Sequence, residues 1–298
     1  MYSIFYTSSI LLQSPTAAFT KKRMAKEWSQ RGYESTVIAS RYVDFRPKPP
    51  QQLTERIVEF LKEKYPGDLS LCLDVGCGSG QCSVLLSPHF EKVLATDISC
   101  SQIDVAKSQN LPSNIEFRVC PAEQSPVEDG SVQIVNAGVC AHWFDLPMFF
   151  KEVDRVLCSN GVVALFSYGP PVVFLHPTKS EELFAALKFF YSDRLGPYWA
   201  SGVKHTENEY ADINLPYPDF VREEVWKEEN LTLAGFVEYL TSWCSYNNYC
   251  KANGDSAGHE ILQEFTSNVQ KALETTHDPQ EIELHFKRKY FLLMAHKP

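Results

Sequence analysis

Apolar and polar positions follow two alternating periods through the middle of the chain. Short apolar runs are typical of buried strands, and stretches whose apolar residues recur every three or four positions are typical of helices. The predicted strands are 71–76, 92–99, 114–120, 131–138 and 162–168. The predicted helices are 53–65, 80–90, 101–110 and 146–158. This alternation favours an α/β domain with a doubly wound, mostly parallel sheet.

The alternation stops after residue 169, where an aromatic, turn-rich stretch begins. The elements predicted beyond it are a helix at 181–193, strands at 220–231 and 281–297, and helices near 232–243 and 258–274. We predict one domain from residue 27 to 298, with a core over about 50–170, a helical cap inserted over about 171–219 and a sheet-closing part over 220–298. The two late strands are expected to form a hairpin that closes the sheet edge.

Composition narrows the class of protein. With 298 residues and 44% hydrophobic content, the chain can bury a large core. Its 37 acidic and 28 basic residues give a formal net charge of -9, which argues against long nucleic acid as a partner. The nine cysteines include no CxxC pair, so neither a metal site nor a disulfide framework is expected, and a cytoplasmic location fits best. No apolar run is long enough to predict a membrane span.

The first 26 residues differ from the rest of the chain. They contain no acidic residue, are rich in Ser and Thr, and carry their basic residues after the apolar part. A secretory signal has the opposite order. We expect a disordered extension over 1–26, and import into mitochondria through this segment is the alternative.

The stretch LCLDVGCGSG, residues 71–80, places three glycines at every second position after a predicted strand. A phosphate-binding P-loop needs a Lys-Ser/Thr pair after the last glycine, and Gln81-Cys82 stands there instead. A dinucleotide fingerprint, GxGxxG, needs the third glycine one position later than Gly80. The loop is therefore not spaced for phosphates.

Two carboxylates accompany the glycines. Asp74 lies two residues before Gly76, and Asp97 ends the next predicted strand, nineteen residues after Gly78. A carboxylate in the loop can accept from an ammonium group, and one at the end of the second strand can accept from both hydroxyls of a ribose. The implied ligand is a nucleoside that carries an amino acid.

These motifs resemble those of the class I S-adenosylmethionine-dependent methyltransferases, whose first motif is DxGxGxG, over about residues 50–170. The resemblance implies S-adenosylmethionine as cofactor and a Rossmann-like, seven-stranded, mostly parallel sheet whose last strand is antiparallel, with helices on both faces. Four further segments resemble the branch that contains trans-aconitate methyltransferase. They are RYVDFRPKPP (41–50), CPAEQSPVEDGSVQIVNA (120–137), CAHWFDLPMFFKEVDRVLCSNGVVALFSYG (140–169) and FVEYLTSWCSY (236–246).

The resemblance implies a role for each matching position. Four residues would hold the methionine end of the cofactor, namely Asp74, Gly76, Gly78 and Gly80. Asp97 would bind the ribose and Ile98 would pack on the adenine, while Ala122 and Glu123 would meet the adenine edge. Asn136 and Ala137 would border the methionine carboxylate and the methyl group. Pro121 stands where relatives often have Asp, so the resemblance does not say which residue accepts the hydrogen bond from the amino group of the adenine.

The acceptor is expected to be a small molecule, and a carboxylic acid is the preferred candidate. Transfer to a carboxylate needs only alignment in a dry site, whereas a hydroxyl or thiol acceptor needs a general base. His142 is the candidate base, and a packed structural histidine is the alternative. Arg46 could grip a carboxylate, with Tyr42 and Trp143 beside it, or could simply be a surface arginine.

Two other functions stay open from the sequence. One is a methyltransferase that acts on a protein or RNA, and the other is a non-catalytic module that binds S-adenosylmethionine without turnover. Asp145, Glu152 and Asp154 are expected to be structural, since Asp145 precedes Leu146-Pro147 as a helix cap would. The sequence carries no signal for oligomeric state.

Overall fold

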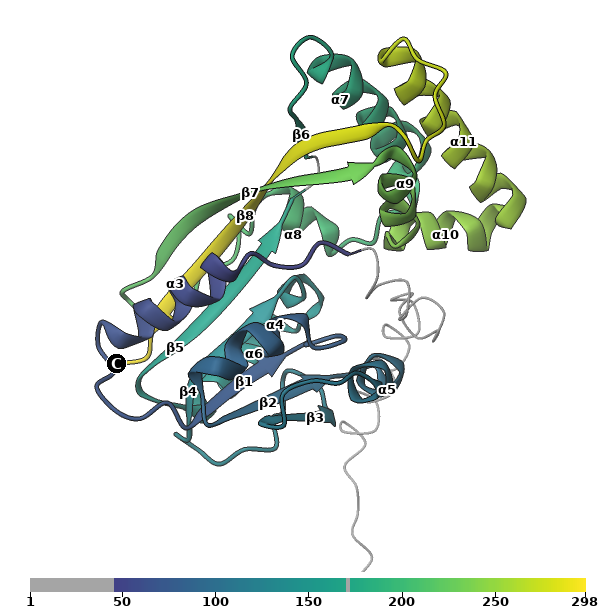
Figure 1. Ribbon diagram of the computed structural model, residues 1–298. Helices are drawn as coiled ribbons and strands as arrows, with labels where there is room; N and C mark the ends of the chain where they lie inside the picture. Colours follow the sequence, from purple (N-terminus) through teal and green to yellow (C-terminus); the bar gives the residue numbers. More distant parts are fainter. Residues whose placement is uncertain (1–45, 170–171) are drawn as a thin grey trace, which may run out of the picture. The chain divides into compact units, whose positions relative to one another are not determined.

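The computed structural model describes residues 46–169 and 172–298 (Figure 1). Within these ranges the chain forms one eight-stranded mixed sheet in the order β3-β2-β1-β4-β5-β8-β6, with β7 paired to β8. The strands are β1 Leu71–Val75, β2 Lys92–Asp97, β3 Ile115–Val119, β4 Val132–Gly138, β5 Leu157–Tyr168, β6 Val173–Phe174, β7 Val221–Thr232 and β8 Glu283–His296.

The first five strands run parallel, and β8 is antiparallel to β5, β6 and β7. The predicted fold class is therefore confirmed, including the late hairpin of β7 and β8. Two details differ from the seven predicted strands, because a two-residue β6 is added and β5 begins at Leu157. The early start includes a bulge at Asn160, whose φ of 62° is left-handed, and the register shifts between Val132 and Ile134 opposite it.

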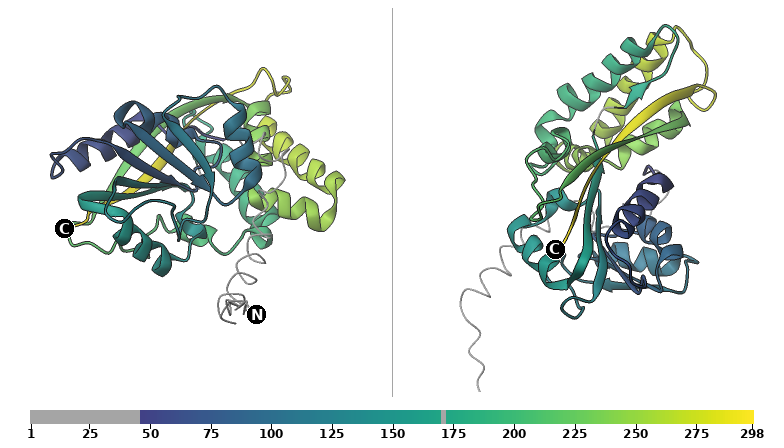
Figure 2. Two further views of the ribbon diagram at one scale, coloured as in Figure 1. Left: turned by 90° about the horizontal axis from the view of Figure 1, so that it is seen from below. Right: turned by 90° about the vertical axis from the view of Figure 1, so that its left-hand side faces the viewer.

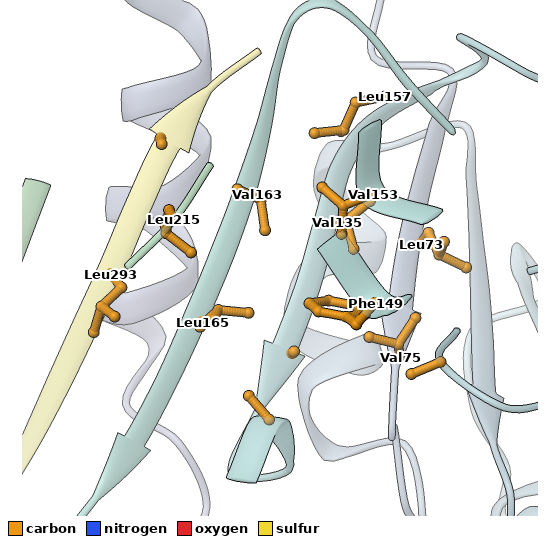
Figure 3. Close-up of a cluster of buried hydrophobic side chains, with 14 of the residues drawn as sticks. Leu73, Val75, Val135, Phe149, Val153, Leu157, Val163, Leu165, Leu215 and Leu293 are labelled. Carbon is orange, nitrogen blue, oxygen red and sulfur yellow. The ribbon is translucent and has the colours of Figure 1, made fainter. Parts of the chain in front are cut away.

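Helices cover both faces of the sheet. The helices of this part are α3 Gln51–Lys62, α4 Gln81–Leu86, α5 Cys100–Ser108 and α6 Leu146–Val156, with short 3-10 turns η1 Ser87–His89 and η2 Ala141–Trp143. On one face Leu53 and Ile57 of α3 pack with Cys72 and Val93 of the sheet. On the other face Phe149 and Val153 of α6 pack on a different set of strand residues: Leu73, Val75, Val135, Val163 and Leu165 (Figure 3).

The sequence expectation that Asp145 caps a helix is confirmed. Its side chain accepts from the backbone N–H of Met148 at 3.2 Å, in the first turn of α6. Glu152 and Asp154 also make structural contacts: Glu152 binds Arg155 and the backbone N–H of Ser125, and Asp154 accepts from Tyr217.

A second group of helices forms a separate hydrophobic cluster. Its elements are α7 Ser180–Lys188, the π-helix η3 Phe189–Arg194, α9 Leu233–Thr241, α10 Cys244–Asn253 and α11 Asp255–Ala272, next to η4 Gly196–Tyr198 and α8 Val203–Glu207. Sequence regions 172–195 and 233–286 contribute to this cluster, whereas Tyr210, Ile213 and Leu215 belong to the core under the sheet. Helices α8 and α10 were not expected from the sequence.

Strand β8 joins the two groups of helices. Its first half contributes Leu284 and Phe286 to the helical cluster, and its second half contributes Phe291 and Leu293 to the sheet core. Figures 1 and 2 follow β8 from its pairing with β5 toward α9 and α11. None of the helices in the described ranges is long and apolar enough to cross a membrane.

Candidate active site

The glycine loop connects β1 to α4, and its three glycines have different surroundings. All three adopt left-handed φ values of 61°, 55° and 90° at Gly76, Gly78 and Gly80. A Cβ on Gly76 would lie 2.7 Å from Sγ of Cys140, and one on Gly80 would lie 2.9 Å from a ring carbon of Phe117. Beside Gly78 the nearest atom is Oε1 of Gln102, at 3.8 Å. At Gly76 and Gly80 a side chain would clash with neighbouring side chains, so packing requires glycine there. At Gly78 there is open space, so a ligand can approach the backbone.

The carboxylate of Asp97 contacts the backbone of Gly78. Its Oδ2 accepts from the backbone N–H of Gly78 at 2.9 Å, and its Oδ1 accepts from that of Ser99 at 2.8 Å. Ser99 in turn caps α5 by accepting from the N–H of Gln102. The acid that ends β2 is therefore held in a fixed orientation beside the open part of the loop, with half-buried Ile98 next to it.

Asp74 is buried, at 1% exposure, and is fully hydrogen-bonded within the protein. Its Oδ2 accepts from the hydroxyl of Ser83 at 2.5 Å, and its Oδ1 accepts from the side-chain N–H of Asn136 at 2.7 Å. Burial raises the pKa of Asp74 to about 6, although these hydrogen bonds work in the opposite direction. The carboxylate therefore ties β1 to α4 and β4, and it brings a negative charge to the base of the loop.

The remaining predicted cofactor residues are placed around the loop in different ways. Ala122, Asn136 and Ala137 are buried, and the first and last belong to the core under the sheet. Glu123 accepts from the backbone N–H of Asp145 at 2.9 Å, so its carboxylate also supports the start of α6. Their roles toward the cofactor stay predictions.

Several buried polar atoms around the loop have no hydrogen-bond partner. In the part of the chain that the structure describes they include Ser79 Oγ, Gln81 Nε2, Thr96 Oγ1, Gln102 Oε1 and Asn136 Oδ1. Buried polar groups are nearly always satisfied in native proteins, so such a concentration indicates a polar ligand. Together with the open side of Gly78 and the carboxylate of Asp97, it fits a nucleoside linked to an amino acid. Sequence reasoning missed Gln102, although a polar residue in the first turn after Asp97 was a usable signal.

The segment after β4 lies against the glycine loop. Cys140 is beside Gly76 and its Sγ donates to the carbonyl of Val75 at 3.2 Å, while a ring carbon of Phe144 lies 3.5 Å from the Cβ position of Gly76. His142 falls between them, in η2. Its Nδ1 lies 2.9 Å from Oη of Tyr210, and its ring centroid is 4.7 Å from that of Trp143. The sequence pointed to His142 and Trp143 but not to Tyr210.

Arg46 connects three segments that are far apart in the sequence. Its Nη1 donates to Oη of Tyr168 at the end of β5, and its Nη2 donates to the carbonyl of Ser242, both at 2.9 Å. The next residue, Trp243, is 5.4 Å from Trp199 and 5.7 Å from Tyr191, measured between ring centroids. Tyr42, predicted beside Arg46, lies outside the described residues. No group of three metal-ligating side chains occurs in the described ranges.

The sheet, the glycine loop and the acid that closes β2 define a Rossmann-like domain that binds a nucleoside at the carboxyl ends of its strands. Residues 73–165 match the family described as "Methyltransferase domain". A Dictyostelium discoideum protein designated as a methyltransferase is 30% identical over 84% of this chain and 90% of its own length. CRG1 of Saccharomyces cerevisiae, designated as an S-adenosylmethionine-dependent methyltransferase, is 25% identical over 72% of this chain and 81% of its own length.

Solved structures agree with this assignment. The structure of a protein from Anaeromyxobacter dehalogenans, described as a type II methyltransferase, is 27% identical, with a TM-score of 0.70, and the match covers 85% of this chain and 98% of that one. The chain therefore belongs to the class I S-adenosylmethionine-dependent methyltransferases, and S-adenosylmethionine is the cofactor of this family.

Proposed function

We propose that this methyltransferase transfers the methyl group to a carboxylate oxygen of a small organic acid, as expected for the trans-aconitate branch that it resembles. The observation that carries the proposal is the position of Arg46, whose guanidinium joins the end of β5 to the segment 236–246. Arg46 belongs to one of the four segments that carry the branch resemblance, and Ser242 belongs to another, so the contact joins two of them near the end of β5.

The chain would contribute alignment and exclusion of water. When bound, S-adenosylmethionine supplies a methyl group on a sulfonium, and a carboxylate oxygen displaces it as the C–S bond breaks and its electron pair stays on sulfur. Arg46 would grip the acid bidentately, and Trp199 and Trp243 would supply apolar walls. Alignment of the two reacting groups can contribute roughly 7 to 11 kcal/mol, so this reaction needs no general base.

A second guanidinium lies against the ring of Tyr168. Arg288 of β8 lies 4.7 Å from the ring centroid of Tyr168, the residue that Arg46 contacts through its hydroxyl. Arg288 is buried, at 2% exposure, donates to Tyr239 at 3.1 Å, and pairs with Glu229 at 2.8 Å. The charge of Arg288 is balanced by Glu229, so Arg288 supports the ring of Tyr168 and the case for an anionic ligand rests on Arg46.

The test is a screen of di- and tricarboxylic acids with methyl-labelled S-adenosylmethionine. Methyl esters release their label as methanol in mild alkali, whereas N-methyl and ether products do not, so the assay identifies the acceptor atom. Label in protein or RNA fractions, or binding without any transfer, would overturn the proposal in favour of the two other functions.

Arg46→Leu gives the residue-specific part of this test. We expect the Michaelis constant for the acid to rise about 10-fold or more, because a charge-assisted hydrogen bond contributes about 1.5 to 3 kcal/mol. The dissociation constant of S-adenosylmethionine should stay within about twofold. The matched control is Arg194→Leu, which removes a surface arginine that pairs with Glu264. An equal loss of affinity for both ligands would assign Arg46 to the cofactor.

We also propose a cytoplasmic location. All nine cysteines are free thiols, which is the state that a reducing compartment maintains. A fluorescent fusion of the whole chain, compared with one that lacks residues 1–26, tests this proposal, and mitochondrial fluorescence of the longer fusion alone would contradict it.

A further inference from the structure

Gln102 is a polar side chain in the buried face of α5. The buried residues of this helix are Gln102, Ile103 and Ala106, and their spacing places them on one side of it. Ile103 packs in a hydrophobic cluster with Ala95 of β2. An apolar side chain is the usual occupant of such a position, yet Gln102 is only 4% exposed. Its amide group is therefore removed from water.

The amide oxygen of Gln102 has no hydrogen-bond partner among the residues that the structure describes. It lies 3.8 Å from the Cβ position of Gly78, on the open side of the glycine loop. A buried carbonyl without a donor destabilises the folded protein, whereas an apolar group of similar shape in its place does not. We therefore expect the missing donor to belong to a ligand that binds beside Gly78.

The backbone of Gln102 is fixed relative to the acid that ends β2. Its N–H donates to Oγ of Ser99 at 3.3 Å, and the N–H of Ser99 donates to Oδ1 of Asp97 at 2.8 Å. The other carboxylate oxygen, Oδ2 of Asp97, accepts from the N–H of Gly78 at 2.9 Å. Asp97 and Gln102 therefore bring two hydrogen-bond acceptors to the same glycine, and the cap of α5 holds them in a set arrangement.

A second buried glutamine shows how the fold satisfies such a group elsewhere. Gln133, at the start of β4, is 6% exposed. Its Oε1 accepts from the backbone N–H of Leu71 at 2.7 Å, and its Nε2 donates to the carbonyl of Ser131 at 3.2 Å. Gln133 lies where β1 and β4 begin, whereas Gln102 lies where the glycine loop follows the end of β1. Burial of a glutamine in this protein does not by itself leave its oxygen without a donor.

We propose that Gln102 is a cofactor-binding residue, whose amide oxygen accepts a hydrogen bond from one ribose hydroxyl of S-adenosylmethionine beside the carboxylate of Asp97. A ribose carries two neighbouring hydroxyls, and each can donate one hydrogen bond to an acceptor such as a carbonyl or carboxylate oxygen. Two acceptors on one glycine match this pair of donors, and they favour a ribose over a deoxyribose. The inference concerns the cofactor, so it holds whichever acceptor receives the methyl group.

Two leucine variants of the full chain separate a ligand contact from a structural one. Gln102→Leu removes an unsatisfied amide, so the ligand-free protein should melt at the temperature of the parent or above it. By calorimetric titration it should bind S-adenosylhomocysteine about 3- to 10-fold more weakly, the effect of one lost hydrogen bond. Gln133→Leu is the matched control, which should melt about 3 °C lower or more and bind this ligand as the parent does.

Analogues of the ligand identify the group that Gln102 meets. The 2′-deoxy and 3′-deoxy forms of S-adenosylhomocysteine should each bind the parent protein more weakly than the complete ligand. In Gln102→Leu one of the two should bind within about twofold of the complete ligand, because its missing hydroxyl no longer has an acceptor to lose. The other analogue should lose the same factor as in the parent, since its hydroxyl meets a different group.

Three results would overturn the proposal. The first is unchanged affinity of Gln102→Leu for S-adenosylhomocysteine, and the second is an equal loss for both deoxy analogues in the parent and in Gln102→Leu. The third is a ligand without the amino group of its adenine that binds the parent weakly but Gln102→Leu as well as the complete ligand does, which would assign Gln102 to the adenine. None of these titrations involves methyl transfer, so their outcome is independent of whether an organic acid is the acceptor.

Discussion

At the residue scale, the two carboxylates of the glycine loop have different environments and should respond differently to substitution. The sequence spacing predicted both carboxylates. Asp97 accepts a hydrogen bond from the backbone N–H of Gly78, the glycine whose surroundings are open, whereas Asp74 is buried and accepts hydrogen bonds from the side chains of Ser83 and Asn136. Asp97 is therefore the direct ligand candidate, and Asp74 acts on the site through its charge.

Asp97→Ala should weaken binding of S-adenosylmethionine about 10-fold or more. The ribose hydroxyls would lose a charged acceptor, which contributes about 1.5 to 3 kcal/mol, and the amides of Gly78 and Ser99 would lose theirs. Calorimetric titration measures the change. Asp104→Ala, an exposed acid on the following helix, is the control and should bind normally. Unchanged affinity of Asp97→Ala would remove the ribose assignment.

The raised pKa of Asp74 leads us to expect that cofactor binding depends on pH. Its pKa in the free protein is raised to about 6 by burial, above the ordinary value near 4. The contribution of this group to folding stability is therefore greatest in acid and is lost as the pH rises through about 6. A cationic ligand favours the ionised carboxylate, so affinity for S-adenosylmethionine should rise with pH up to about 6 and then level off.

The measurement is a titration series between pH 5 and 8. Asp74→Asn keeps an acceptor and a similar size without the charge, so its affinity should be lower and independent of pH in this range. Equal pH profiles for the parent protein and Asp74→Asn would show that another group causes the dependence.

The sequence predicted these acids and glycines because they obey fixed spacings at strand ends. It did not predict Gln102 or Tyr210, since neither belongs to a local pattern. Tyr210 reaches His142 only because a left-handed turn, held by Arg222, places it there. Contacts of this kind depend on tertiary packing, which periodicity does not encode.

At the element scale, helix α6 begins at the N-cap that the sequence predicted. Asp145→Ala should lower the free energy of unfolding by about 1 kcal/mol, because the N–H of Met148 loses its acceptor. Urea unfolding measures this loss. The exposed Glu128→Ala is the control and should change stability by less than about 0.5 kcal/mol. A stability loss confined to the control would exclude the capping role.

Elements with a clear period were predicted well, and elements without one were not. Strands β1 to β4 and helices α3 and α6 appear where the apolar spacing placed them. Helix α10, CSYNNYCKAN, was missed because its residues are mostly polar and its formation depends on packing against α11 and neighbouring aromatic rings. The early start of β5 was missed because Asn160-Gly161 is typical of a turn and here forms a bulge inside the strand.

At the scale of the whole molecule, β8 makes the helical cluster and the sheet core one cooperative unit. Phe286, fully buried between Phe174 and Phe236, belongs to the helical cluster, while Leu293 on the same strand belongs to the sheet core. Phe286→Ala should therefore destabilise the whole described fold by about 3 to 5 kcal/mol. Calorimetry should show one transition at a lower temperature.

Trp226→Ala is the control for this prediction, because that ring is 45% exposed on β7 and its removal should cost little. Two separate transitions in Phe286→Ala, one of them at the parent temperature, would show that the helical cluster unfolds independently of the sheet.

The position of β8 also has a consequence for synthesis of the protein on the ribosome. Among the strands of the described sheet, β8 is translated after all the others, yet it provides the hydrogen-bonding partner of both β5 and β7. Until residues 283–296 have left the exit tunnel, the apolar edge of β5 has no neighbour and resembles the exposed strand edges from which aggregates grow. The nascent chain should therefore depend on chaperones until β8 is made, and translation that stops before residue 283 should yield an insoluble product.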